Sequence, residues 1–179
     1  MVIFMNEIRP ATIDEASRIA QSVNISTDGL MSTILGAHWH DILTSVVMVP
    51  DHELSYENAR IAQDSHSLLG VAISSSGATP KSDSACRHIG IRFSTRTAML
   101  FLSASPIFRF LGTHESIDWH LTSLSVNAES RGSGIGSALL AVFIDIGTRN
   151  GASRLTIDVD IKNRRARQLY EREEFVETS

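Results

Sequence analysis

Hydrophobic residues recur along the chain with two periods, and the alternation of these periods predicts strands and helices in turn. Val2–Arg9 is expected to form a short first strand. Asn58–Gln63 and Ser67–Ser75 lie on either side of a short polar turn, as in a β-hairpin. The front of the chain therefore predicts three strands.

Two helices are expected between the first strand and the hairpin. Pro10 and Thr12 open the first helix, Asp28 caps the second, and Pro50 stops it. Their apolar residues, at helical spacing, are Ile13, Ala16, Ile19, Ala20 and Val23, then Leu30, Ile34, Leu35, Trp39, Ile42, Leu43 and Val46. Arg92–Gly112 predicts a helical insertion.

The pattern is clearest in the last third of the chain. Trp119–Val126 predicts a strand, Gly134–Arg149 an amphipathic helix, Arg154–Asp160 a second strand and Asn163–Glu173 a last helix. A strand, a helix and a strand form a βαβ unit, which favours parallel pairing. We therefore expect an α/β fold (α+β) with a mixed sheet.

Apolar positions in the Trp119–Val126 strand change parity. Trp119 and Leu121 occupy one set of alternate positions, and Leu124 and Val126 the other. A bulge between the two pairs would keep all four side chains on one face. Such a bulge would also splay this strand from the next and open a cleft.

Composition restricts the class of protein. The 179 residues are 42% hydrophobic and 20% charged, as expected of one soluble globular domain spanning residues 1–179. Sixteen Lys and Arg against twenty Asp and Glu give a net charge of −4, which disfavours a nucleic-acid partner. The single cysteine, Cys86, excludes an internal disulfide.

No membrane segment, signal peptide or metal site is expected. Ala98–Leu111 is too short and too interrupted to span a bilayer, and the N-terminus lacks a basic segment followed by an apolar run. His38 and His40 would point to different faces of a helix, and the other histidines are scattered. A cytoplasmic location follows as the simplest expectation.

Three alternating glycines, Gly132, Gly134 and Gly136, stand where the predicted helix Gly134–Arg149 begins. Their exposed backbone amides and the helix dipole would receive a phosphate, although a simple tight turn would use the same glycines. Ser137 and Ala138 do not complete a Walker loop. Only nineteen residues follow Asp160, too few for a dinucleotide-binding fold. Ser125 lies in no nucleophile elbow, which argues against a hydrolase.

The segment Arg131–Gly136 resembles the Arg/Gln-x-x-Gly-x-Gly/Ala signature of the GNAT superfamily of acetyl-CoA-dependent N-acyltransferases. Leu121–Val126 resembles the fourth strand of that family, and Asp158–Glu171 its closing Asn-x-x-Ala-x-x-Leu-Tyr-Glu block. Ser55–Gly70 resembles the second and third strands of some members. The convincing match covers Trp119–Phe175.

This resemblance implies a GNAT-like fold with a splayed central sheet flanked by helices, and acetyl-CoA as co-substrate without a metal. The loop amides would hold the pyrophosphate, the strand edge would pair with pantetheine, and one face of the last helix would line the coenzyme. These residues are, in turn, Arg131, Gly132, Ser133, Gly134, Ile135, Gly136 and Ser137; Leu124, Ser125 and Val126; and Asn163, Ala166 and Tyr170.

Two catalytic roles follow from the resemblance and from proton affinities. Tyr170 is the candidate general acid, because a phenol with a pKa of about 10 donates a proton to a leaving thiolate of pKa about 8.5. His120 is the candidate base, with Asp118 and Glu57 as alternatives. A core role for Tyr170, a packing role for His120 and a helix-cap role for Asn163 remain open.

Two departures from the family pattern bear on the fold. Glu174 stands where many relatives have a glycine, so the last helix is expected to end differently. Relatives also continue through two more strands, so the C-terminal strands are expected to be shortened or missing. An exposed sheet edge there would favour a homodimer.

The sequence thus predicts an N-acetyltransferase that moves an acetyl group from acetyl-CoA to a primary amine by direct attack in a ternary complex. The amine would belong to a small molecule or to a protein. The alternative is a non-catalytic acyl-CoA sensor or assembly module with the same fold.

Overall fold

The computed structural model describes residues 7–65, 67–79, 115 and 117–178. Its strands are β1 (Glu7–Pro10), β2 (Ala59–Gln63), β3 (Leu68–Ser76), β4 (Asp118–Val126) and β5 (Arg154–Ile157). Its α-helices are α1 (Ala16–Ser26), α2 (Leu30–Leu35), α3 (Trp39–Val47), α6 (Ile135–Arg149) and α7 (Arg164–Arg172). Short 3₁₀ turns are η1 (Ile13–Glu15), η2 (Gly36–His38), η3 (Tyr56–Asn58) and η4 (Ala128–Ser130).

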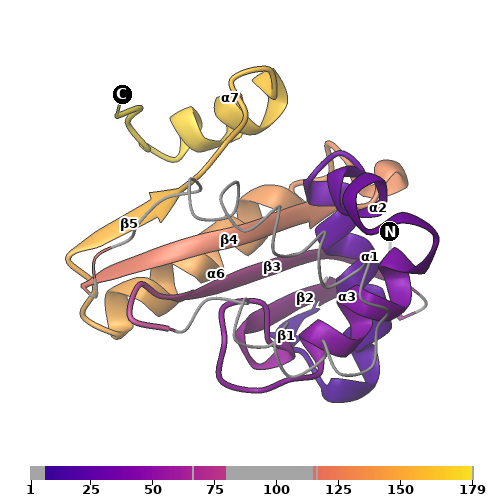
Figure 1. Cartoon of the computed structure of the whole chain (residues 1–179). Coiled ribbons are helices and arrows are strands. Elements are labelled where there is room, and N and C mark those ends of the chain that lie inside the picture. The colour runs from indigo at the N-terminus through magenta and orange to yellow at the C-terminus, as the bar shows by residue number, and fades with distance from the viewer. Residues whose placement is uncertain (1–6, 66, 80–114, 116, 179) are drawn as a thin grey trace.

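The described strands form one mixed sheet in the order β1-β2-β3-β4-β5 (Figure 1). Neighbouring strands are antiparallel except β4 and β5, which are parallel and are connected through α6. The predicted βαβ unit and the predicted mixed sheet are therefore confirmed. The order places β4 beside β5 at one end of the sheet.

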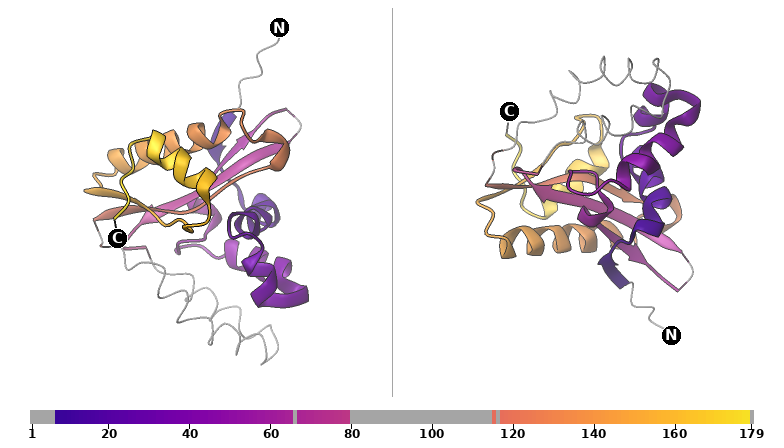
Figure 2. Two further views of the ribbon diagram at one scale, coloured as in Figure 1. Left: turned by 90° about the horizontal axis from the view of Figure 1, so that it is seen from above. Right: turned by 60° about the horizontal axis from the view of Figure 1, so that its bottom comes forward.

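Two apolar clusters cover the two faces of the sheet. Ile61 and Ile73 face α1 and α3, whereas Ala62, Ala72 and Leu121 belong to the cluster that contains α6. Figure 2 shows α6 on one side of the sheet and the indigo and purple helices on the other. Adjacent residues of β2 and β3 fall in different clusters because successive side chains of a strand point to opposite faces.

The first predicted helix is present, and the second is divided. A 3₁₀ turn and α1 follow Thr12, whose backbone N–H donates to the Glu15 carboxylate. The second predicted helix is interrupted at Gly36, whose φ of 67° and ψ of −151° are not helical. Asp28 does not cap it: Gly29 is the N-cap of α2, with a left-handed φ of 80°.

The predicted bulge is present in β4. Ile73 of β3 pairs with Ser123 and Ser74 pairs with Leu121, so Thr122 is the extra residue of β4. The α6 cluster includes Leu121 before the bulge and Leu124 after it. The extra residue thus keeps both side chains on the same face, which is what the change of parity requires.

The ends of the other elements lie close to the predicted ones. β5 ends at Ile157 and not at Asp160, because its pairing with β4 stops at Leu121. No strand is formed by 175–178, the described residues that follow α7. The start of the first predicted strand and the Arg92–Gly112 insertion lie outside the described residues.

Candidate functional site

The loop between β4 and α6 depends on two glycines in a left-handed conformation. Gly132 has a φ of 83°, and Gly134, the N-cap of α6, has a φ of 88°. Side chains other than glycine rarely adopt such angles. A Cβ atom at Gly134 would meet no heavy atom within 4 Å, so the space beside it is open.

Most amides of this loop have no backbone acceptor among the described residues. The Arg131 and Ser133 amides donate, over 3.3 and 3.4 Å, to carbonyls of η4. In the described part of the chain, the amides of Gly132 and of Gly134–Ser137 have no backbone acceptor, and the first paired donor of α6 is Ala138. Unpaired amides at a helix N-terminus form an anion site. Five of the seven predicted amides are therefore available, and two are used within the loop.

β4 has two different edges along its length. Asp118–Leu121 pairs with Arg154–Ile157 of β5, whereas Thr122–Val126 continues past the end of β5. In Figure 1 the chain after β5 leads away from the sheet towards α7. The sheet is splayed as predicted, and the predicted pantetheine-binding residues Leu124, Ser125 and Val126 lie in the part that β5 leaves.

Helix α7 covers the end of β4 that follows the bulge. A Cβ atom at Gly136 would lie 3.3 Å from Leu169 Cδ2 and 3.7 Å from Val126 Cγ2, so α6, β4 and α7 meet at this glycine. Arg165 Nη2 lies 4.0 Å from the Cβ position of Gly132. The structure therefore brings the predicted loop, strand edge and last helix together.

Asn163 has the structural role that the sequence left open. Its Oδ1 accepts a hydrogen bond from the Ala166 amide over 3.1 Å and so caps α7. Ala166 follows one turn later on the same helix. The cap fixes where α7 begins, and therefore where Tyr170 stands.

Tyr170 is half-buried, and its ring lies against Phe175 with centroids 6.3 Å apart. Burial raises the pKa of Tyr170 to about 12. The phenol is thus fully protonated at neutral pH but is a weaker acid than the sequence-based value of about 10 implied. Tyr170 also has a structural role, because its side chain packs against the edge of the α6 cluster.

The prediction that α7 must end differently from its relatives is wrong. Glu174 itself adopts a φ of 65°. The Phe175 amide donates to the Tyr170 carbonyl and the Glu174 amide to the Glu171 carbonyl, which are the two hydrogen bonds of a Schellman motif. The contact between Tyr170 and Phe175 completes that motif, so a non-glycine residue here accepts the strained conformation.

His120 lies in the paired half of β4 and is largely buried. It pairs with Ser75 of β3 and Thr156 of β5, and its Nδ1 lies 3.0 Å from Thr156 Oγ1. Only Leu121 separates it from the bulge residue Thr122. His120 alternates with Trp119 and Leu121 of the α6 cluster, so it faces the opposite side of the sheet from Tyr170.

The two alternative bases are engaged in other contacts. The buried Asp118 carboxylate accepts two hydrogen bonds from Arg154, over 2.9 and 3.1 Å. Glu57 lies in η3, where its carboxylate accepts from the Asp51 amide over 3.2 Å. The turn η3 comes directly before β2, and β3 lies between β2 and β4 in the sheet. The geometry therefore favours His120 among the three.

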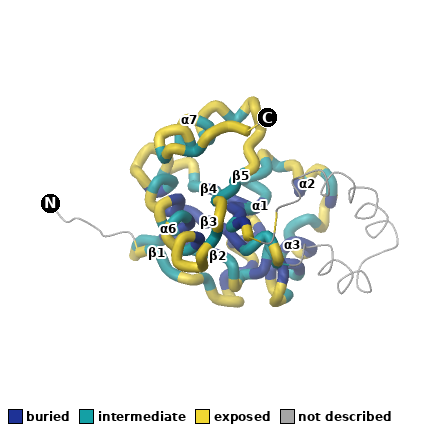
Figure 3. Tube along the Cα trace, turned by 90° about the vertical axis from the view of Figure 1, so that its left-hand side faces the viewer, coloured by how far each residue is buried: buried dark blue, intermediate teal, exposed yellow. Residues whose placement is uncertain are grey.

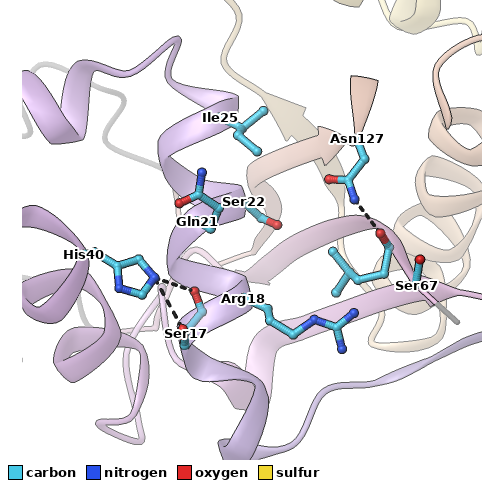
Figure 4. Close-up of a pocket in the computed structure, with 9 residues that line it drawn as sticks. Ser17, Arg18, Gln21, Ser22, Ile25, His40, Ser67 and Asn127 are labelled. Atoms are coloured by element: carbon cyan, nitrogen blue, oxygen red, sulfur yellow. Dashed lines mark hydrogen bonds between the residues drawn. The ribbon is translucent and has the colours of Figure 1, made fainter. Parts of the chain in front are cut away.

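A hollow of about 500 Å³ lies elsewhere, on the α1 side of the sheet. Figure 4 shows Ser17, Gln21 and Ser22 of α1 at its wall, with His40 of α3 and Asn127, the residue after β4. None of the predicted site residues lines it. The hollow is therefore separate from the arrangement of loop, strand edge and α7.

Within the described residues, no group of three or more His, Cys, Asp or Glu side chains could hold a metal ion. Across that same part of the chain, no helix has the length and apolar character needed to cross a bilayer.

Sequence reasoning missed two residues next to His120. Thr156 is its cross-strand neighbour, and Asp158 Oδ2 lies 3.9 Å from its Nε2. The signal was present in part, since a parallel β4–β5 pair was expected. Register, however, could not be read from the sequence, and register decides which residue of β5 stands opposite His120.

Comparison with known proteins identifies the family. Residues 95–175 match the model of the acetyltransferase (GNAT) family. No curated protein matches the chain by sequence. Similar solved structures are numerous, and all those described next share less than a fifth of their residues with this chain, so they show the fold alone.

One similar structure is an N-acetyltransferase from Staphylococcus aureus Mu50, with 17% identity, a TM-score of 0.69, and 97% of this chain and 92% of that chain covered. An aminoglycoside N-acetyltransferase, AAC(6')-Iy, in complex with CoA has 15% identity, a TM-score of 0.64 and coverage of 100% and 94%. A ribosomal-protein-alanine N-acetyltransferase from Brucella melitensis biovar Abortus 2308 has 16% identity, a TM-score of 0.53 and coverage of 94% and 89%. Residues 95–175 thus match the acetyltransferase (GNAT) family, and the chain as a whole has the fold of solved N-acetyltransferases.

Proposed function

We propose that the protein transfers an acetyl group from acetyl-CoA to a primary amine. The observation that carries the proposal is that β4–β5 pairing ends at Leu121 and leaves an open stretch of β4, whose last residue, Val126, lies against the α6 N-terminus with its unpaired amides. His120 and Tyr170 lie on opposite faces of the sheet. A reacting centre held in the opening beyond Leu121 would be within reach of both side chains.

The residues present fit the coenzyme. The open space beside Gly134 and the unpaired amides around it suit a pyrophosphate, and Arg165 adds a positive charge near Gly132. The edge of Thr122–Val126 is long enough to pair with an extended pantetheine chain. Acetyl-CoA would supply the activated thioester.

The reaction requires that the amine lose a proton before it attacks. An alkyl ammonium of pKa about 10.4 is almost fully protonated at pH 7, so a base must take that proton, and neutral His120 is the candidate. The amine nitrogen then forms a bond to the acetyl carbon and the carbon–sulfur bond breaks. The second proton of the nitrogen is released as the amide forms, which balances the proton gained by the sulfur.

Tyr170 would donate a hydrogen bond to the departing sulfur. With its pKa at about 12 and that of a thiol near 8.5, complete transfer of the phenolic proton would be uphill by roughly 5 kcal/mol. Its role is therefore to stabilise the developing negative charge, with the final proton supplied by the nitrogen or by solvent.

The test is release of free CoA thiol from acetyl-CoA in the presence of a defined panel: kanamycin, spermidine and a peptide that begins with alanine. Kanamycin, an aminoglycoside, and the alanine peptide follow the acceptors named for two of the similar structures, and spermidine adds a simple alkyl amine. We expect thiol release with at least one amine, and a loss of about 100-fold in kcat for Tyr170→Phe with acetyl-CoA affinity unchanged. Tight acetyl-CoA binding without transfer to any primary amine would instead support the sensor function.

A further inference from the structure

His120 is held by its neighbour on β5. The two residues are directly paired in the parallel ladder, and His120 Nδ1 lies 3.0 Å from Thr156 Oγ1. The His120 side chain is only 9% exposed. A buried ring with a hydrogen bond at one nitrogen has a fixed orientation, and a threonine hydroxyl can accept from Nδ1–H, which leaves Nε2 as the basic nitrogen.

Asp158 lies on the other side of the same ring. It follows the last residue of β5, at the point where β5 leaves β4, and its Oδ2 is 3.9 Å from His120 Nε2. Its side chain is 47% exposed, so the carboxylate stands at the opening rather than in the core. The two ring nitrogens therefore face different groups: a hydroxyl at Nδ1 and a carboxylate at Nε2.

The other described groups around the ring bring no uncompensated charge. Asp118, two residues earlier in β4, is ion-paired with Arg154, which also contacts Glu115 at 3.1 Å. β3 contributes Ser75, the cross-strand partner of His120, which carries no charge. Asp158 is thus the carboxylate placed to act on the charge of the ring.

We propose that Thr156 and Asp158 are positioning residues for His120 as the base of the acetyl transfer. Thr156 fixes the ring and its tautomer, so that Nε2 faces the opening between β4 and β5. When Nε2 takes a proton from the substrate ammonium, the Asp158 carboxylate stabilises the resulting imidazolium. The proposal rests on the proposed function for the origin of that proton, but not for the coupling among the three side chains.

The coupling is measured by NMR titration of the full-length protein, with the His120 signals assigned by their loss in His120→Gln. Asp158→Asn should lower the midpoint of the His120 titration by about 0.5 to 1 pH unit, because it removes a nearby opposite charge that is partly screened by solvent. Asp160→Asn is the matched control. It removes an equal charge two residues further along, where the carboxylate accepts from the Lys162 amide, and should leave the midpoint unchanged.

Thr156 is tested through the ring nitrogens. Thr156→Val should change the ¹⁵N shifts of Nδ1 and Nε2 as the tautomer ratio changes, and Thr156→Ser should restore them. An unchanged midpoint in Asp158→Asn, or unchanged nitrogen shifts in Thr156→Val, would overturn the proposal.

The same variants separate this proposal from the proposed function. If the panel amines are acetylated, Asp158→Asn should lower kcat/KM on the plateau of the pH profile, because His120 becomes a weaker base, and should shift the acidic limb to lower pH. Altered NMR titration without any acetyl transfer would retain the coupled side chains and refute the enzyme. Acetyl transfer with identical pH profiles in Asp158→Asn and Asp160→Asn would retain the enzyme and refute the positioning role.

Discussion

The two halves of β4 have the same neighbours on one edge and different ones on the other. Asp118–Leu121 lies between β3 and β5, with a buried aspartate ion pair and a buried histidine. Thr122–Val126 keeps β3 but lacks β5, and the glycine loop and α7 stand around it. A single extra residue, Thr122, separates the two halves.

The comparison shows how one strand supports both stability and chemistry. Figure 3 shows buried residues gathered around the central strands and α6, while α7 is half-buried or exposed. α7 has no fully buried residue, whereas α6 buries Ile135, Leu139, Leu140 and Phe143. The closed half is held by a strand on each edge, whereas the open half leaves one backbone edge and space for a ligand.

The largest effect on stability is expected from truncating the closed half. Leu121 is 3% exposed and lies among Leu139, Leu140 and Phe143. Leu121→Ala should lower the free energy of unfolding by about 3 kcal/mol, measured by urea denaturation. Leu124→Ala, beyond the bulge and only partly buried, should cost about 1 kcal/mol. Equal losses would mean that the two halves do not differ in packing.

Alkaline pH tests the enclosure of Tyr170 near the open half. Its pKa is raised to about 12 in the folded protein, so the stability it contributes is complete below pH 10 and is lost as the pH rises from 10 to 12. That loss should be roughly 2 to 3 kcal/mol from this one group. Tyr170→Phe should remove it.

The control for this pH effect is Tyr56→Phe, which leaves Tyr170 in place. Urea denaturation of the three proteins at pH 8 and pH 11.5 makes the comparison. A variant lacking Tyr170 that lost as much stability as the parent would show that the phenol is not enclosed.

The smallest effect is expected at the end of α7. Glu174 has a left-handed φ of 65°, which a glycine adopts without strain. Glu174→Gly should therefore raise the free energy of unfolding by about 1 kcal/mol. Glu173→Gly removes the same charge from a residue with a φ of −96°, and should instead lower it by about 0.5 to 1 kcal/mol. Thermal melting of both variants decides, and destabilisation by Glu174→Gly would contradict the account of this helix end.

The sequence predicted the open half more fully than the contacts that orient its chemistry. The change of parity between Leu121 and Leu124 was enough to predict the bulge, because strand periodicity is strict. The glycines predicted the loop for a similar reason, since few other residues adopt a left-handed φ. Local rules of this kind need no knowledge of the rest of the fold.

What could not be predicted depends on long-range register and on strain. Nothing in the sequence around His120 indicates that Thr156 stands opposite it. The break at Gly36 and the left-handed Glu174 went against helical periodicity and glycine preference, because tertiary packing outweighs preferences of about 1 kcal/mol. The ion pair of Asp118 with Arg154 likewise required the β4–β5 ladder.

The central claim is that the open half of β4 and the glycine loop together bind acetyl-CoA, and calorimetric titration tests it most directly. The parent protein should bind acetyl-CoA saturably, and Gly134→Glu should weaken binding by about 100-fold or more, because a carboxylate would enter the anion site. Gly151→Glu is the matched control: Gly151 also has a left-handed φ, of 70°, and open space, but it follows the C-terminal end of α6. It should bind acetyl-CoA like the parent. Equal binding by Gly134→Glu and Gly151→Glu, or no binding by the folded parent, would contradict the claim.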